Sequence, residues 1–210
     1  MSPAPAPFSN PACAMPGEIK LVVVDAAPLI TLAAVQSLDY LLYPALPLII
    51  PDAVFHEATA AAGKLGAQAI IDWYREHIAA VRVEPTQIFR DEMIVREAIG
   101  GRLSRDLGER AALEVVRDPN LLRPDELALL LSDDRDVQRL VVADPERTVL
   151  LTTWDYLRQL EEARRIQSAE AVMDAVRASG RNPPVRDLFK DHPAELRDQV
   201  QRILRRSDKA

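Results

Sequence analysis

Five short aliphatic stretches recur along the chain, with amphipathic segments between them. The aliphatic stretches are 19–24, 48–50, 79–83, 127–131 and 149–151. Short runs rich in Val, Ile and Leu and bounded by polar residues, proline or glycine are typical of buried strands. The pattern therefore predicts five strands. The stretch 79–83 is short and partly polar, and we expect it near an edge of the sheet.

Segments with apolar residues at helical spacing follow most of these strands. Pro28, tolerated in a first helical turn, opens a helix to about Gln36, and Asp52 is placed to cap a helix over 53–62. Further helices are predicted over 67–77, 88–99, 107–116, 136–142, 154–165 and 193–206, with another between 166 and a loop at 180–184. Alternating strands and helices indicate an α/β fold, a three-layer α/β/α sandwich with a mostly parallel sheet, followed by C-terminal helices.

The length of 210 residues suits one well-buried domain with an appendage, or at most two small domains. We expect a flexible Pro/Ala-rich tail over 1–16, an α/β domain over 17–165, and a C-terminal helical extension over 166–210 that packs on the domain or continues it. No apolar run approaches the roughly 20 residues that span a bilayer. Residues 1–16 also lack the basic start and apolar core of a secretory signal, so we expect a cytoplasmic protein without a membrane partner.

The residues that bind soft metals are scarce. Cys13 is the single cysteine, which excludes an internal disulfide framework and a cysteine-rich zinc site. The three histidines, His56, His77 and His192, are scattered along the chain, which argues against a histidine-dominated site. A metal ion would therefore be bound by oxygen.

Charge is unevenly distributed along the chain. The net charge is −6, which argues against broad nonspecific binding to nucleic acid. Residues 177–210 carry nine Lys or Arg against five Asp or Glu, a net of +4, which leaves −10 on residues 1–176. The acidic part could hold cations while the basic tail contacts phosphates, or the tail could be a solvated helix.

Acidic side chains follow the predicted strands. Asp25 comes directly after the first strand, and Asp133 and Asp134 follow the fourth. Ligands bind outside the carboxyl ends of the strands in open parallel sheets, where such acids can meet although they are distant in sequence. Their mutual repulsion favours a cation, and Mg²⁺ suits a few carboxylates while it keeps several waters.

Helix capping is the alternative explanation of the same acids. Asp106 and Glu109 have the spacing of a capping box, and Ser132, Asp133 or Asp134 could cap the helix that follows. Glu57 lies too far into its helix to cap it, so its alternative is an ordinary solvated glutamate. Both explanations stay open from the residues alone.

Four segments, in this order and at this spacing, resemble the motifs of PIN-domain proteins. They read Val-Val-Asp-Ala-x-Pro-Leu-Ile-x-Leu-Ala, Ile-Pro-Asp-Ala-Val-x-x-Glu, Leu-Gly-Glu-x-Ala-Ala-Leu and Leu-Leu-x-Ser-Asp-Asp-Arg-Asp. The Leu-Gly-Glu form and the strand that leads into Thr152-Thr153 are similar to a prokaryotic branch related to VapC-type toxins. The resemblance covers about 19–165.

The resemblance implies a metal-dependent ribonuclease whose acids hold Mg²⁺ or Mn²⁺. Its catalytic and metal-binding residues would be Asp25, Glu57, Glu109 and Asp134, with Asp106, Asp133, Asp136 and Ser132 as accessory or alternative groups. One departure lies two places after the first aspartate, where the small hydroxyl residue common in the family is replaced by Ala27. The loss removes a hydroxyl that could orient a ligand or a carboxylate, and it removes no acid.

The leading hypothesis is hydrolysis of RNA phosphodiester bonds, with Arg135, Arg202, Arg205 and Arg206 as candidate RNA contacts. The resemblance also implies a toxin with a small antitoxin partner, and pairing of two copies. The alternative is a catalytically weak PIN-like module that acts through protein binding. A phosphoacceptor receiver and a haloacid-dehalogenase-type phosphatase are disfavoured. The first needs an aspartate after the third strand, and the second needs one at the position of Ala27.

Overall fold

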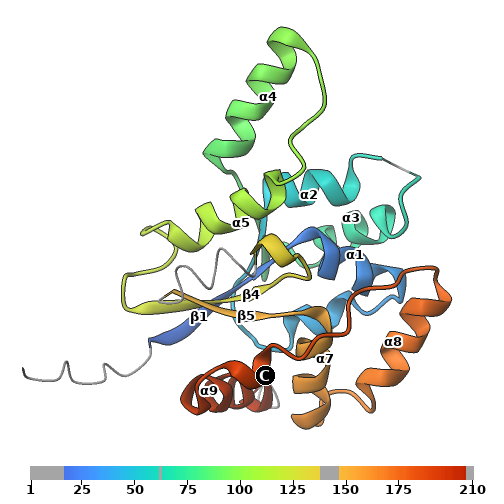
Figure 1. Cartoon of the computed structure of the whole chain (residues 1–210), viewed down its shortest axis with the longest axis vertical. Helices are drawn as coiled ribbons and strands as arrows, with labels where there is room; N and C mark the ends of the chain where they lie inside the picture. The colour runs from blue at the N-terminus through green and yellow to red at the C-terminus, as the bar shows by residue number, and fades with distance from the viewer. Residues whose placement is uncertain (1–16, 62, 138–146, 207–210) are drawn as a thin grey trace, which may run out of the picture.

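Five parallel strands form one sheet at the centre of the structure, a computed structural model that describes residues 17–61, 63–137 and 147–206. The strands are β1 (Glu18–Val24), β2 (Leu48–Pro51), β3 (Val81–Glu84), β4 (Glu126–Leu131) and β5 (Thr148–Leu151), in the order β3-β2-β1-β4-β5 (Figure 1). Each neighbouring pair is parallel. The predicted three-layer α/β/α fold and the edge position of the third strand are confirmed. The predicted tail over 1–16 and most of the predicted helix over 136–142 lie outside the described residues.

The α-helices are α1 (Ala26–Ala34), α2 (Asp52–Thr59), α3 (Ala67–Glu76), α4 (Gln87–Ile99), α5 (Leu107–Arg117), α7 (Thr153–Glu162), α8 (Ala169–Ala178) and α9 (Ala194–Arg206), with short 3-10 turns at Leu38–Leu42 and Phe189–Asp191. The predicted starts of the first two helices were wrong. The first helix begins at Ala26 because the Asp25 side chain caps it, and Pro28 lies within its first turn. Asp52 is the first residue of α2 rather than its cap, although its carboxylate accepts hydrogen bonds from the amide of Ala53 and from Thr86.

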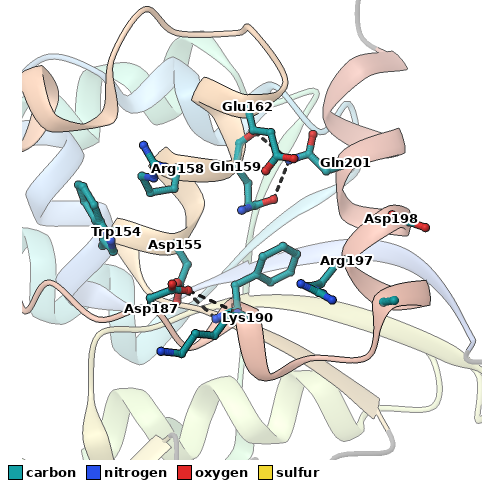
Figure 2. Close-up of a pocket in the computed structure, with 12 residues that line it drawn as sticks. Trp154, Asp155, Arg158, Gln159, Glu162, Asp187, Lys190, Arg197, Asp198 and Gln201 are labelled. Carbon is teal, nitrogen blue, oxygen red and sulfur yellow. Dashed lines mark hydrogen bonds between the residues drawn. The ribbon is translucent and has the colours of Figure 1, made fainter.

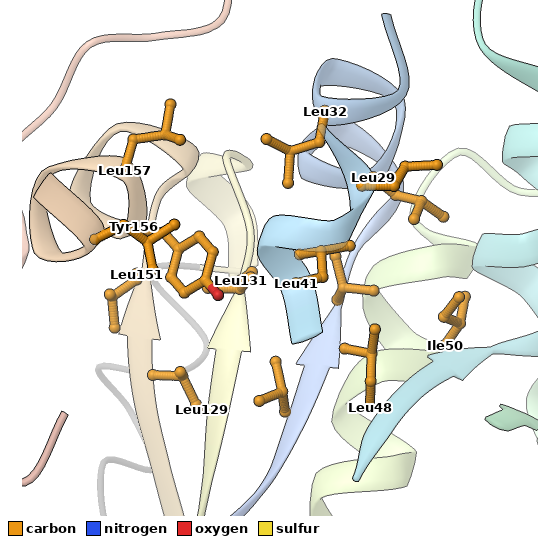
Figure 3. Close-up of a cluster of buried hydrophobic side chains, with 14 of the residues drawn as sticks. Leu29, Leu32, Leu41, Leu48, Ile50, Leu129, Leu131, Leu151, Tyr156 and Leu157 are labelled. Atoms are coloured by element: carbon orange, nitrogen blue, oxygen red, sulfur yellow. The ribbon is translucent and has the colours of Figure 1, made fainter. Parts of the chain in front are cut away.

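Both faces of the sheet are covered by helices (Figure 1). On β1, Val22 and Val24 pack into one core with α1 and α7, whereas Leu21 and Val23 pack into another against α5. Figure 3 shows the first of these cores, in which Tyr156 of α7 lies among leucines of the strands and of α1. Because successive side chains of a strand point to opposite faces, burial of both faces explains why the strands are continuously apolar.

The C-terminal segment is tied to the start of α7 by the buried carboxylate of Asp155. This carboxylate accepts hydrogen bonds from the Thr152 amide and hydroxyl, in a capping box, and from the backbone amides of Leu188 and Phe189. Burial raises the pKa of Asp155, against these hydrogen bonds. The carboxylate therefore joins the start of α7 to residues 188–189, and this contact positions the chain that leads to α9.

Helix α9 packs against the beginning of β1. The backbone amide of Ile19 donates to Gln199 Oε1 at 2.7 Å, and Gln199 Nε2 donates to the Gly17 carbonyl at 3.1 Å. This contact places α9 at the amino end of β1, away from the end at which Asp25 lies. No helix within the described parts of the chain is long and apolar enough to cross a membrane.

Candidate metal centre

The carboxyl ends of β1 and β4 bring Asp25 beside Ser132. The two strands are adjacent and parallel, with Val24 opposite Leu131, so the residues that follow them are neighbours. The Ser132 hydroxyl donates to Asp25 Oδ2 at 2.9 Å, and the Ala26 amide donates to Asp25 Oδ1 at 2.7 Å. Asp25 is buried, and each of its oxygens keeps a further lone pair after these bonds. Capping of α1 and binding of a cation are therefore compatible roles for this side chain.

The Asp25 carboxylate lies in an environment that disfavours its charge. Burial raises the pKa of Asp25 to about 6, against the hydrogen bonds from Ala26 and Ser132. The charges of Glu57 and Asp133 raise this pKa further. Two acids from other parts of the sequence are thus close enough to repel Asp25.

Gly108 makes room for two of the carboxylates. A Cβ atom built on Gly108 would lie 3.3 Å from Glu57 Oε2 and 3.6 Å from Asp25 Oδ1. The beginning of α5 therefore passes directly against Glu57 of α2 and against Asp25 at the end of β1. This close approach gives the glycine of the Leu-Gly-Glu motif a physical role.

Glu109, the next residue of α5, faces the acids that follow β4. Burial raises its pKa to about 7, together with the charge of Asp134 and a hydrogen bond shared with it. The charges of Asp25 and Asp136 act in the same direction. Asp134 is held by local bonds, since its amide donates to Ser132 Oγ at 3.2 Å and its Oδ1 accepts from the Asp136 amide at 2.5 Å.

The structure thus brings the four predicted acids to one end of the sheet, where they influence one another. Their donor atoms are all carboxylate oxygens, the ligands that Mg²⁺ and Mn²⁺ prefer. Within residues 17–61, 63–137 and 147–206, no three acidic, histidine or cysteine side chains are arranged as a formed ion site. The set fits a hard divalent ion in the chemistry of its donor atoms. Closure around the ion requires rotation of side chains such as Glu57, which is exposed.

Asp133 has a different partner. Its Oδ1 accepts from the Thr153 amide at 2.8 Å and its Oδ2 accepts from the Thr153 hydroxyl at 2.7 Å. The residue is buried, and burial raises its pKa. Asp133 therefore fixes the first residue of α7 to the end of β4, and it does not cap the segment that directly follows it.

The capping box predicted for Asp106 and Glu109 is wrong. Asp106 occupies the N-cap position of α5, but its exposed side chain makes no capping hydrogen bond. Glu109 faces Asp134 instead. The spacing alone could not reveal this, because the direction of the Glu109 side chain depends on how α5 packs against the sheet.

The predicted RNA-contact arginines lie in different places. Arg135 is exposed and adjoins Asp134 at the acidic end of the sheet. Arg202 lines a cavity of about 290 Å³ with Glu18, at the opposite end of β1 from Asp25. At about 3.3 Å per residue, that separation is roughly 20 Å. Arg205 is exposed on the same helix, and the side chain of Arg206 lies outside the described residues. Helix α9 therefore does not bring Arg202 to the acids.

One basic residue near the acids escaped the sequence analysis. Arg181, in the loop after α8, donates from Nε to Thr31 Oγ1 at 3.3 Å, and its charge acts on Asp133. Burial lowers the pKa of the Arg181 guanidinium. Nothing in the local sequence marks this arginine, because its position depends on the packing of α8 beside α1.

A cleft of about 410 Å³ lies away from the four predicted acids, between α7 and α9. Figure 2 shows Arg158 of α7 and Arg197 of α9 on its two sides, and Gln201 Nε2 of α9 donates to Gln159 Oε1 of α7 at 2.6 Å. Its lining carries charges of both signs, including Lys190 and Asp187. None of the four predicted acids lines this cleft, so it is separate from the candidate metal centre.

Gly108→Ala tests the close approach of α5 to the acids. The added methyl group would press on Glu57 Oε2, the far end of an exposed side chain, and on Val54 Cγ2 at 3.3 Å. The crowding lowers stability, whereas alanine favours a helix over glycine by roughly 1 kcal/mol. Because the two effects oppose each other, we expect little change in the free energy of unfolding. We expect about a tenfold loss of Mn²⁺ affinity, as when groups that orient metal ligands are changed. Calorimetric titration with Mn²⁺ and urea unfolding measure the two effects, and unchanged affinity would contradict this role of Gly108.

Comparison with protein families supports a nuclease. A family model described as a PIN domain matches residues 21–182, which is more than half of the chain. No curated protein and no solved structure matches the chain. PIN domains are in general nucleases, and they typically use divalent metal ions. The match takes in all five strands, β1 from Leu21 onward, together with α7 and α8, and the chain belongs to the PIN-domain family.

Proposed function

We propose that the protein is a metal-dependent ribonuclease that hydrolyses RNA phosphodiester bonds. Asp25, Glu57, Glu109 and Asp134 would hold Mg²⁺ or Mn²⁺. The observation that carries the proposal is the convergence of these acids, since Gly108 lies directly against both Glu57 Oε2 and Asp25 Oδ1, and Glu109 faces Asp134. Burial is the main cause of the raised pKa values of Asp25 and Glu109, and repulsion from the neighbouring acids raises them further. A cation would relieve this repulsion.

Ser132 and Gly108 help to position the acids. The Ser132 hydroxyl orients Asp25, which supports activity in spite of the hydroxyl that is absent at Ala27. Gly108 leaves the space in which Glu57 and Asp25 approach each other. A bound divalent ion would supply an activated water and would neutralise charge on the phosphate.

Single-stranded or looped RNA is the proposed substrate, because its backbone and bases are accessible. Arg135 is exposed beside Asp134, where a phosphate next to the scissile bond would pass. The biological role that we propose is that of a toxin controlled by a small antitoxin protein. This role rests on the resemblance to VapC-type proteins.

Cleavage of a labelled single-stranded RNA by the full-length protein tests the proposal. We expect products in Mg²⁺ or Mn²⁺ and intact RNA in the presence of a chelator. RNA that stays intact with both metals, or that is cut equally with the chelator, would refute the ribonuclease proposal.

A second candidate function is favoured by the outer side of α4. Ile94, Val95 and Ile99 are 58%, 53% and 81% exposed on this helix, none of whose residues is buried. Apolar side chains exposed together mark protein-binding surfaces. A PIN-like module that acts through protein binding, with an antitoxin or a second copy as its partner, would use them. Co-purification with a partner, without RNA cleavage in either metal, would favour this alternative.

A further inference from the structure

A group of basic and aromatic side chains borders the acidic site where α4 meets α2. His56 of α2 lies beside Phe89 of α4, with 5.3 Å between the ring centroids. Lys64, which follows α2, donates from Nζ to the Glu57 carbonyl at 2.8 Å. We call His56, Lys64, Phe89 and Arg96 the α2–α4 patch. It adjoins the candidate metal centre because His56 and Glu57 are consecutive in α2.

Arg96 belongs to the patch through helix geometry. It lies seven residues after Phe89, which is two turns along the same face of α4. That face meets α2 at His56. The charges of Arg96 and Lys64 also act on His56, whose pKa is lowered first by burial and then by these two cations. Two cations thus converge on one histidine.

No acid of the described chain neutralises these two cations. Neither Lys64 nor Arg96 forms an ion pair with any residue in 17–61, 63–137 or 147–206. Glu92 shares the face of Phe89 and Arg96, but its carboxylate accepts from the Ser104 amide and hydroxyl at 2.9 and 2.7 Å. Glu57 directs its carboxylate toward Gly108. Adjacent cations without an acidic partner are the electrostatic signature of a surface that binds an anion.

We propose that the α2–α4 patch binds backbone phosphates of a single-stranded RNA that extends from the candidate metal centre across α2. The identity of the ligand rests on the proposed ribonuclease function. Lys64 and Arg96 would each contact a phosphate, and the His56 and Phe89 rings fix the spacing between α2 and α4. An RNA strand fits better than a protein partner, because the cations lie beside the acids proposed to cut RNA. Of the exposed apolar residues of α4, Ile94 lies on the opposite side of the helix from Phe89, and Ile99 lies one turn beyond Arg96.

The test compares two double variants that remove the same charge. Lys64→Gln with Arg96→Gln changes the patch, and Arg202→Gln with Arg205→Gln changes α9 at the other end of the sheet. Binding of a fluorescent single-stranded RNA is measured by anisotropy over a series of salt concentrations in chelator, so that cleavage does not interfere. Each lost phosphate contact reduces the slope of log affinity against log salt by about 0.7 for single strands. We expect the patch variant to lose about 1.4 from this slope and at least about tenfold in affinity at low salt, and the α9 variant to match the wild type.

Three outcomes would refute the proposal that the α2–α4 patch binds RNA. They are an unchanged salt slope in the patch variant, an equal loss in the α9 variant, and a change in oligomeric state, measured by light scattering, that accounts for the altered binding. The last of these would make the surface a contact between two copies. Binding is measured without metal, so its result is separate from the cleavage assay. A protein that binds RNA through the patch but never cuts it would refute the proposed function and leave the patch in place.

Discussion

Asp25→Asn is expected to lower metal-dependent RNA cleavage by more than about a hundredfold. Loss of a group that only supports a metal ligand costs about 10–100-fold in affinity or activity, and loss of a ligand should exceed that. Asparagine keeps the shape of the side chain, and its oxygen can still accept from the Ala26 amide while its NH2 group donates to Ser132 Oγ, the reverse of the bond that the carboxylate accepts. The variant therefore removes a charge and leaves the end of β1 intact. Asp134→Asn is expected to behave in the same way.

Asp133→Asn is the matched control for this prediction. Asp133 is a buried acid one residue from Asp134, but both of its oxygens are used by Thr153. We expect this variant to retain most of the cleavage, because an amide oxygen can still accept from the Thr153 backbone. Initial rates at saturating Mn²⁺ measure all three proteins, and circular dichroism checks their folding. If Asp25→Asn and Asp134→Asn cut RNA as fast as the wild type, these acids are not the metal ligands.

The strands and their terminal acids were predictable because the signals are local. Continuous aliphatic runs required a sheet buried on both faces, and the parallel order placed the ends of β1 and β4 together. Asp25 and Asp134 follow from that logic alone. Glu57 and Glu109 came from the family motifs, and their approach to Asp25 depends on how α2 and α5 pack.

Other features of the site could not be predicted because they depend on tertiary contacts. Ser132 was proposed as an accessory group, but its bond to Asp25 joins residues 107 positions apart in the sequence. The bond between Asp133 and Thr153 needs the neighbouring position of β4 and β5. The basic C-terminal residues suggested RNA contacts by composition, whereas α9 holds Arg202 near Glu18. The α2–α4 patch has no counterpart in any local pattern, since the contact between His56 and Phe89 joins two helices.

The metal-free wild type is expected to lose stability through Asp25 as the pH rises. The pKa of Asp25 is about 6 in the folded protein, against an ordinary value of 3.8. A raised pKa means that the folded state favours the protonated acid, so this contribution is complete below pH 3.8 and is lost as the pH rises through 6. The difference corresponds to about 3 kcal/mol, at about 1.36 kcal/mol per pKa unit. Other titrating groups also make stability depend on pH. They are the same in wild type and Asp25→Asn, so the difference between the two proteins isolates the contribution of Asp25.

In chelator at pH 8, Asp25→Asn should therefore be more stable than the wild type by about 3 kcal/mol, and the two should be nearly equal at pH 4. Urea unfolding at pH 4, 6 and 8 measures the difference, and a difference that stays constant over this range would show that burial does not disfavour the Asp25 charge. Saturating Mn²⁺ at pH 8 should raise the stability of the wild type more than that of the variant, because only the wild type offers this carboxylate to the ion. The burial that makes Asp25 costly in the metal-free protein is thus the property that would make it a strong ligand. A variant that gains stability as it loses cleavage would show that this cost is retained for function.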